Sequence, residues 1–301
     1  MPVVDLVGDK NINIRPLVDQ FLVWNASREY GKRDYARFHA SQWEDCHRKV
    51  VYHYYESKGW IKVDKKRASK MADPRLERIF GNGHFVHDRW RIYLTELGII
   101  RGYWRCANFM AHRESNDGLY GTDEKYGIFK PTSPCSCGCP DYLYEEVGFY
   151  DEETNWGGHV DGIIDFSGLD VAKWDVGTVQ FNGGGKELFV LDFKSINPFS
   201  YSKLQEPELK HRTQMQIYLY LSGFPFGLFV YENKGDQSVK EFTVLRDDGW
   251  IEQKKEEAIA LKQVVNSVNS KGKHVLPPRA HREMTHSECS KCRFRSHCWR
   301  A

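Results

Sequence analysis

An apolar run in the sequence ends in an acidic residue and a lysine that are two positions apart, Asp192 and Lys194. The run, residues 188–191, predicts a buried β-strand, and alternate residues of a strand point to the same face of a sheet. A second apolar stretch, residues 160–166, contains Asp161 and predicts a neighbouring strand. We therefore expect two carboxylates and one ammonium group to meet at the ends of adjacent strands.

These three side chains suit the hydrolysis of a phosphodiester bond. Carboxylates bind Mg²⁺ or Mn²⁺, and the bound ion polarises a phosphate group and lowers the pKa of a water molecule. A nearby lysine, Lys194, can position that water or stabilise the charge that develops on the phosphate. A single Asp-x-Lys pair is more often part of a solvated strand face, so the interpretation depends on the other residues of the set.

The full set appears along the chain as Gly83-x-x-x-His87, Asp161, Asp192-x-Lys194 and Gln214-x-x-x-Tyr218. This order resembles the signature of the PD-(D/E)XK nuclease superfamily, and within it the RecB-like exonucleases. His84 competes with His87, because it is three residues away on the same helical face. Gln216 and Tyr220 repeat the Gln-x-x-x-Tyr pattern on the same predicted helix, residues 207–222.

The resemblance implies a role for each residue of the set. It assigns catalysis to Lys194, Asp161, Asp192, Gln214 and Tyr218. It assigns the Mg²⁺ or Mn²⁺ ion to His87, Asp161, Asp192 and the backbone carbonyl of Phe193. An acidic residue on the strand before Asp161 is a further candidate ligand, with Glu146 preferred to Glu145.

Eight cysteines without a signal peptide favour metal binding over disulfides. Cys289, Cys292 and Cys298 form a C-x2-C-x5-C run near the C-terminus, and Cys46 is a candidate fourth ligand. Ser41 and Glu44 have the spacing of a capping box, which predicts a helix that begins at Ser41 and contains Cys46 one turn in. Four thiolates can hold either a [4Fe–4S] cluster or a zinc ion, and free thiols are the third alternative.

One early cysteine combined with three at the end of the chain resembles the iron–sulfur branch of the RecB-like nucleases. That branch includes AddB-type helicase–nucleases and the CRISPR-adaptation nucleases. The resemblance implies a [4Fe–4S] cluster bound by Cys46, Cys289, Cys292 and Cys298, with a structural role.

A second group of metal-type side chains lies in the middle of the chain: Cys106, His112, Cys135, Cys137 and Cys139. Tight cysteine turns that contain glycine and proline are typical of zinc knuckles. Five candidates exceed the four ligands that zinc needs, so at least one is surplus. The alternatives are an inserted zinc-binding segment and unligated thiols.

Charge and hydropathy limit the class of partner. The net charge of +2 gives no overall attraction to a polyanion, so contacts with nucleic acid must come from local patches, such as the basic residues 273–301. The sequence has no apolar run of 18 residues and no signal peptide. We expect a cytoplasmic protein, in a bacterium or a phage-infected host, without a membrane partner.

The predicted fold class is α/β, with a mixed central β-sheet flanked by helices in a restriction-endonuclease-like core. A helical N-terminal segment and a C-terminus tied by the iron–sulfur cluster complete it. The expected segments are a helical N-terminal part (1–72), a core helix with the motif histidine (73–105), a cysteine-rich insertion (106–140), the nuclease core (141–250), and a C-terminal helix and cluster-binding tail (251–301). Strands are expected at 142–149, 158–166, 187–194, 227–232 and 240–245.

These observations predict a metal-dependent DNA exonuclease that acts on single strands or DNA ends. It would serve recombination, repair or replication, with recombination or replication proteins as candidate partners, and it looks similar to phage or prokaryotic exonucleases. An RNA endonuclease with the same metal site is one alternative. A non-catalytic DNA-binding module is another, although a degenerate site usually loses the lysine or one carboxylate.

Overall fold

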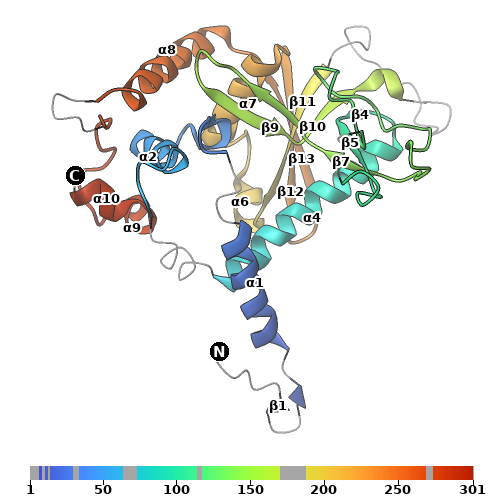
Figure 1. The fold of residues 1–301 in the computed structure, drawn as a ribbon, viewed down its shortest axis with the longest axis horizontal. Helices are drawn as coiled ribbons and strands as arrows, with labels where there is room; N and C mark the ends of the chain where they lie inside the picture. The colour runs from blue at the N-terminus through green and yellow to red at the C-terminus, as the bar shows by residue number, and fades with distance from the viewer. Residues whose placement is uncertain are drawn as a thin grey trace. The chain divides into compact units, whose positions relative to one another are not determined.

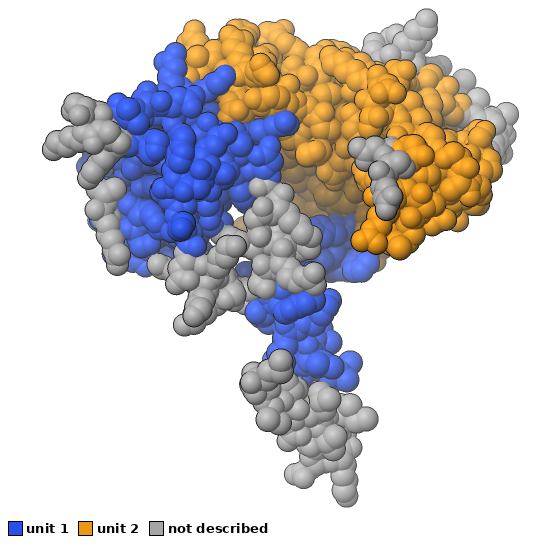
Figure 2. Space-filling model, viewed as in Figure 1, with its two compact units in different colours: residues 1–38, 45–85, 261–301 blue, residues 39–44, 86–260 orange. Residues whose placement is uncertain are grey.

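The computed structural model describes residues 7–8, 11–12, 14–29, 34–63, 73–113, 117–169, 188–268 and 274–300. The chain divides into two compact units, which Figure 2 colours separately. Unit 1 comprises residues 1–38, 45–85 and 261–301, and unit 2 comprises residues 39–44 and 86–260. Among the described residues, no helix combines the length and the apolar character needed to cross a membrane.

Unit 2 is built on a five-stranded sheet in the order β13-β12-β11-β10-β4 (Figure 1). The strands are β4 (Ile100–Arg101), β10 (Gly162–Asp165), β11 (Leu188–Ile196), β12 (Phe226–Asn233) and β13 (Val239–Leu245). β11 and β12 are parallel, whereas the other neighbours are antiparallel. A mixed central sheet flanked by helices confirms the predicted α/β class.

Helices α4 (Pro74–Glu96) and α7 (Leu209–Ser222) cover opposite faces of this sheet. Phe193 of β11 stacks on Trp90 of α4, with ring centroids 5.9 Å apart. Lys194, the next residue, reaches Gln214 of α7. Because successive residues of a strand point to opposite faces and alternate residues to the same face, Asp192 and Lys194 share the face that α7 covers.

Two of the predicted strands are wrong, because each is divided between two sheets. The stretch predicted at 142–149 forms β7 (Tyr142–Glu145) and β8 (Val147–Tyr150), and the stretch predicted at 158–166 forms β9 (Trp156–Val160) and β10. β7 pairs with β5 (Tyr103–Cys106), β8 pairs with β9, and β10 pairs with β11. The breaks fall at Glu146 and Asp161, so the chain changes sheets at two candidate site residues.

Further strands and helical segments complete the fold. β3 (Phe38–His39) joins β9 and β8 in a three-stranded sheet, and β6 (Leu119–Tyr120) joins β5 and β7 in another. The remaining elements are η1 (Ala40–Gln42), η2 (Phe166–Gly168), α6 (Pro198–Lys203) and α8 (Asp248–Val265).

Unit 1 combines N-terminal helices with the C-terminal tail. Its elements are β1 (Val7–Gly8), β2 (Asn11–Ile12), α1 (Arg15–Glu29), α2 (His47–Ser57), α9 (Ser287–Lys291) and α10 (Arg295–Arg300). Phe294, between the two tail helices, is fully buried and stacks on Tyr52 of α2 with ring centroids 5.5 Å apart. Arg293 forms an ion pair with Glu56 at the other end of α2. These contacts join the tail to α2.

The predicted start of this helix at Ser41 is wrong. Ser41 lies in the 3-10 turn η1, and Glu44 accepts a hydrogen bond from Thr213 Oγ1 at 2.7 Å instead of closing a capping box. Cys46 is the N-cap residue of α2. Cys46 therefore precedes the helix and does not lie one turn inside it.

Candidate metal and catalytic site

The pairing of β8 with β9 places two acidic residues opposite each other. Val147 faces Val160 in the register of these strands. Glu146 immediately precedes Val147 and Asp161 immediately follows Val160, so the two carboxylates project just beyond the same end of this pair. Glu145 forms an ion pair with Arg105, whereas Glu146 shares Arg91 with Asp161, which favours Glu146 as the candidate metal ligand.

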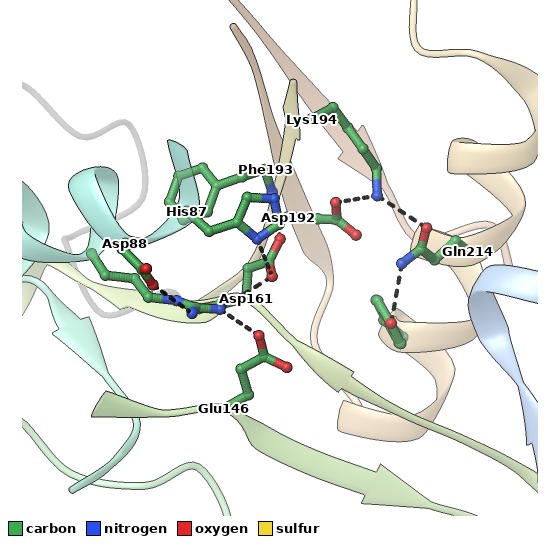
Figure 3. Close-up of polar contacts among 10 residues, drawn as sticks. His87, Asp88, Glu146, Asp161, Asp192, Phe193, Lys194 and Gln214 are labelled. Carbon is green, nitrogen blue, oxygen red and sulfur yellow. Dashed lines mark hydrogen bonds and ion pairs between the residues drawn. The ribbon is translucent and has the colours of Figure 1, made fainter. Parts of the chain in front are cut away.

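Asp161 is held by groups from two other elements (Figure 3). The amide of Phe193 in β11 donates a hydrogen bond to Asp161 Oδ2 at 2.7 Å. His87 Nδ1 of α4 lies 3.1 Å from Asp161 Oδ1. The predicted competitor His84 is exposed to solvent. The fold thus brings His87, and not His84, to the carboxylate.

Asp192 is 2% exposed, and its Oδ1 atom lies 2.5 Å from Lys194 Nζ. The two charges pair closely, but this buried oxygen accepts no hydrogen bond of regular geometry from the described residues. The ammonium group of Lys194 compensates the charge of this buried carboxylate. Carboxylate oxygens are also the ligands that hard divalent cations prefer.

The predicted side-chain ligands lie in one place but not at ligand spacing. Among the described residues, the groups of ligand atoms that all lie within 4.8 Å of one another do not include His87, Asp161 and Asp192 together. Asp192 is engaged by its ion pair with Lys194, and Asp161 is engaged by the hydrogen bond from the Phe193 amide. Binding one ion between them would require side-chain rotation. The carbonyl of Phe193 remains a predicted ligand.

Burial and pairing separate the proton affinities of the two carboxylates. Burial raises the pKa of Asp192 to about 6, and the charge of Lys194 opposes this only in part. Burial also acts on Asp161, but the hydrogen bond from His87 and the nearby positive charges outweigh it and lower its pKa. Burial lowers the pKa of His87, yet its hydrogen bond to Asp161 prevails and the net shift is upward. The pair His87–Asp161 therefore favours the charged form of both partners.

Gln214 and Tyr218 extend from Lys194 into the core. Lys194 Nζ donates to Gln214 Oε1 at 3.1 Å, and Gln214 Nε2 donates to Tyr218 Oη at the same distance. The two side chains are only 7% and 4% exposed. A Cβ atom at Gly158 would lie 2.8 Å from the Tyr218 ring, so the tyrosine needs a glycine beside it. This burial indicates that Gln214 and Tyr218 hold the Lys194 side chain in position from the protein core.

The alternative pair on α7 has a different role. Gln216 Nε2 donates to the carbonyl of Leu245 at 2.7 Å, and its Oε1 accepts from the amide of Asp247 at 2.9 Å. Gln216 therefore secures the segment that joins β13 to α8. Of the two patterns on this helix, Gln214 and Tyr218 lie at the candidate site.

Arg91 is a component of the site that the sequence analysis missed. It forms ion pairs with Glu146 and with Asp161, whose backbone carbonyl it also contacts at 3.2 Å. Its exposed fraction is 14%. The signal was its position four residues after His87, which places both on one face of α4. Arg91 balances part of the negative charge at this end of β8 and β9.

The four cysteines predicted to bind the cluster lie in unit 1 around a cavity of about 430 Å³. Cys46 is at the N-terminus of α2, Cys289 and Cys292 belong to or follow α9, and Cys298 lies in α10. Burial raises the pKa of Cys289 and of Cys292. All four thiols line the same cavity. Arg48 donates to Cys298 Sγ at 3.7 Å.

The middle cysteines form a tighter group in unit 2. The ligand atoms of Cys106, His112, Cys135 and Cys137 all lie within 4.8 Å of one another. Cys139, the fifth predicted candidate, is outside this group and donates through Sγ to the carbonyl of Asp141 at 3.6 Å.

No protein-family model and no curated protein matches the sequence. The solved structure of SSO0001 is similar in fold at 16% identity, with 95% of this chain and 98% of that chain covered and a TM-score of 0.44. An alkaline exonuclease from Laribacter hongkongensis, LHK-Exo, is 16% identical over 82% of this chain and 92% of its own, with a TM-score of 0.39. Its complex with dAMP gives 15% identity, the same coverage and a TM-score of 0.38. Values this low say nothing about the function of this chain.

Proposed function

We propose that the chain is a metal-dependent nuclease that hydrolyses phosphodiester bonds in DNA. The observation that carries the proposal is the meeting of Asp161, Asp192 and Lys194 at adjacent strands, with His87 3.1 Å from Asp161. Two carboxylates, an imidazole and an ammonium group in one partly buried place are the parts that this reaction needs. A merely structural ion pair would not need the second carboxylate or the histidine.

Each residue has a distinct role in this proposal. Asp161, Asp192, His87 and the Phe193 carbonyl would hold Mg²⁺ or Mn²⁺, with Glu146 as a further ligand. The ion, when bound, supplies Lewis acidity and lowers the pKa of water. Lys194 places a positive charge beside the scissile phosphate, and Gln214 and Tyr218 fix the lysine in that position.

A single strand or a DNA end is the substrate that we favour. Phe199 of α6 is 70% exposed and lies five positions beyond Lys194 on the chain segment that continues β11. Lys203 Nζ lies 3.9 Å from its ring centroid. An exposed aromatic ring beside a cation can stack an unpaired base without reading its identity. Processing of ends in recombination, repair or replication is the process that such an exonuclease would serve.

We further propose that Cys46, Cys289, Cys292 and Cys298 hold a [4Fe–4S] cluster. Four thiols line one cavity, which is the donor set of a cubane cluster. A single tetrahedral zinc ion would need sulfurs only ~3.8 Å apart. Within the described residues, these cysteines are not among the groups with ligand atoms within 4.8 Å of one another. The spacing therefore favours the larger cofactor.

Matched DNA and RNA oligomers, single- and double-stranded and labelled at either end, test the function. We expect release of short products from single-stranded DNA with Mg²⁺ or Mn²⁺, and loss of this activity in Asp161→Asn. Cleavage of RNA alone, or internal cuts alone, would replace the proposal with an RNA endonuclease or a DNA endonuclease. Binding without cleavage under every metal condition would indicate a non-catalytic DNA-binding module.

A further inference from the structure

A second metal-binding arrangement lies in unit 2, on the sheet formed by β6, β5 and β7. Cys106 Sγ lies 3.6 Å from Cys137 Sγ, and Cys135 Sγ lies 3.1 Å from His112 Nε2. A disulfide would bring two sulfurs to ~2.05 Å. A tetrahedral zinc ion with Zn–S of ~2.3 Å and Zn–N of ~2.0 Å sets ligand atoms ~3.5–3.8 Å apart. The Cys106–Cys137 distance therefore fits one ion and not a disulfide, and the Cys135–His112 contact would have to lengthen by ~0.4 Å to match a shared zinc ion.

The imidazole in this group is oriented from its far side. Asp117 Oδ1 lies 2.8 Å from His112 Nδ1, which leaves Nε2 directed at Cys135 Sγ. A carboxylate on the second ring nitrogen is the usual partner of a histidine that ligates a metal. A Cβ atom at Gly118 would lie 2.6 Å from the His112 ring, so this position needs a glycine. Asp117 and the close approach of Gly118 thus orient His112 in addition to its contact with Cys135.

The thiols come from strand β5, which contains the buried Cys106, and from a tight turn that contains the buried Cys135 and the exposed Cys137. Cys106 is fully buried and Cys135 is 4% exposed, next to Trp104 and Tyr142. The amide of Cys135 donates to the carbonyl of Cys139, and the amide of Gly138 donates to that of Cys135. Gly138 has a φ of +82°, which a residue with a side chain rarely adopts. This tight turn aims the thiols of Cys135 and Cys137 at Cys106.

We propose that Cys106, His112, Cys135 and Cys137 form a structural zinc site, with Asp117 as the positioning residue of His112 and Cys139 as the surplus cysteine. Three thiolates and one imidazole in tetrahedral geometry are one of the usual donor sets of zinc, and a site closed by four protein ligands is structural. The site ties the last residue of β5 to the turn that leads into β7.

The position of the site links it to the catalytic region. Cys106 of β5 pairs with Tyr142, the first residue of β7. β7 ends at Glu145, so Glu146 follows directly, and the ring of Tyr144 lies 5.1 Å below the Arg91 guanidinium. A zinc ion bound near the start of β7 would therefore help to hold Glu146 and Arg91 in their positions at the site.

A matched pair of variants, Cys137→Ser and Cys139→Ser, tests the site in the full-length protein. The two residues belong to the same turn and neither is fully buried, so both variants should fold. Any zinc bound by Cys46, Cys289, Cys292 and Cys298 would be the same in both variants. By elemental analysis, we expect about one equivalent of zinc per chain in the wild type and in Cys139→Ser, and a loss of about one equivalent in Cys137→Ser.

Cobalt substitution and Asp117→Asn sharpen the test. Co²⁺ should give thiolate charge-transfer and tetrahedral ligand-field bands in Cys139→Ser, and these bands should weaken in Cys137→Ser. Asp117→Asn should lower zinc affinity ~10–100-fold in competition with a chelator. Equal zinc content in all variants, or zinc lost from Cys139→Ser but kept in Cys137→Ser, would overturn the assignment. Unchanged affinity in Asp117→Asn would overturn the role of Asp117.

Discussion

The carboxylate–lysine site of unit 2 and the four cysteines predicted to bind the cluster in unit 1 differ in what stabilises them. In unit 2, Asp161 accepts hydrogen bonds from the Phe193 amide and from Arg91, while Asp192 pairs with Lys194. In unit 1, four cysteines line a cavity of about 430 Å³. The first site balances its charges with its own residues, so it should remain folded without an ion. The second should depend on its cofactor for stability.

The largest effect should follow the loss of the lysine. Lys194→Ala should reduce DNA cleavage by ~10³-fold, because the charge acts on the transition state. The melting temperature and iron content should stay close to those of the wild type. Lys210→Ala is a matched control, since the Lys210 side chain is 63% exposed and pairs with Glu208. Wild-type cleavage by Lys194→Ala would show that the assigned site is wrong.

The opposite pattern is expected for the tail. Cys292→Ser should remove iron and lower the free energy of unfolding by roughly 3 kcal/mol, as for the loss of a cross-link that closes a long loop. Cys292→Ser combined with Cys298→Ser should cost no more than either change alone, because both break the same centre. Denaturant unfolding and iron analysis measure this.

Cys139→Ser is the control for the tail, since Cys139 lies in unit 2. Additive losses from the two tail substitutions, or full iron content in Cys292→Ser, would contradict a shared cluster and remove the contrast between the units.

A smaller effect should separate the two glutamines of α7. Gln214→Ala removes the hydrogen bond to the charged Lys194, which is worth ~1.5–3 kcal/mol. We expect kcat to fall by tenfold or more. Gln216→Ala also removes a buried side chain but should retain kcat, since Gln216 bonds to Leu245 and Asp247 and not to Lys194. Steady-state kinetics distinguish the two. Equal kcat values for both variants would exclude a positioning role for Gln214.

The smallest expected effect is that of pH on metal affinity. Burial raises the pKa of Asp192 to about 6, and the hydrogen bond to Asp161 outweighs burial to raise that of His87. Both groups must lose a proton to bind a cation, so affinity should rise with pH. Below pH 6, we expect the affinity for Mn²⁺ to fall ~tenfold per pH unit for each proton displaced. Calorimetric titration at several pH values measures the slope, and a flat profile would contradict these ligands.

Local pattern was sufficient for part of the site. The two-residue spacing of Asp192 and Lys194 placed them on one face of a strand, and the four-residue spacing of Gln214 and Tyr218 placed them on one face of a helix. These are periodicities of single elements, so they need no knowledge of partners. The mixed sheet flanked by helices was predicted on the same basis together with the resemblance.

Pairing between strands and side chains that are distant in the sequence explains what local patterns could not predict. The breaks at Glu146 and Asp161 arise because each of the two predicted strands is divided between two different sheets. The periodicity of a stretch does not indicate which strands it pairs with. Arg91 joined the site through ion pairs to residues 55 and 70 positions away. The capping box failed because Glu44 bonds to Thr213, far along the chain. Long-range pairing overrode local signals in each case.

One experiment tests the metal-dependent nuclease site most directly. The holoprotein is dialysed against EDTA, and cleavage of single-stranded DNA is measured before and after the addition of Mn²⁺, together with iron content and the melting temperature. We predict that cleavage disappears in EDTA and returns with Mn²⁺, while iron and the fold are unchanged. Undiminished cleavage in excess EDTA would contradict the assignment of Asp161 and Asp192 as ligands of a catalytic ion.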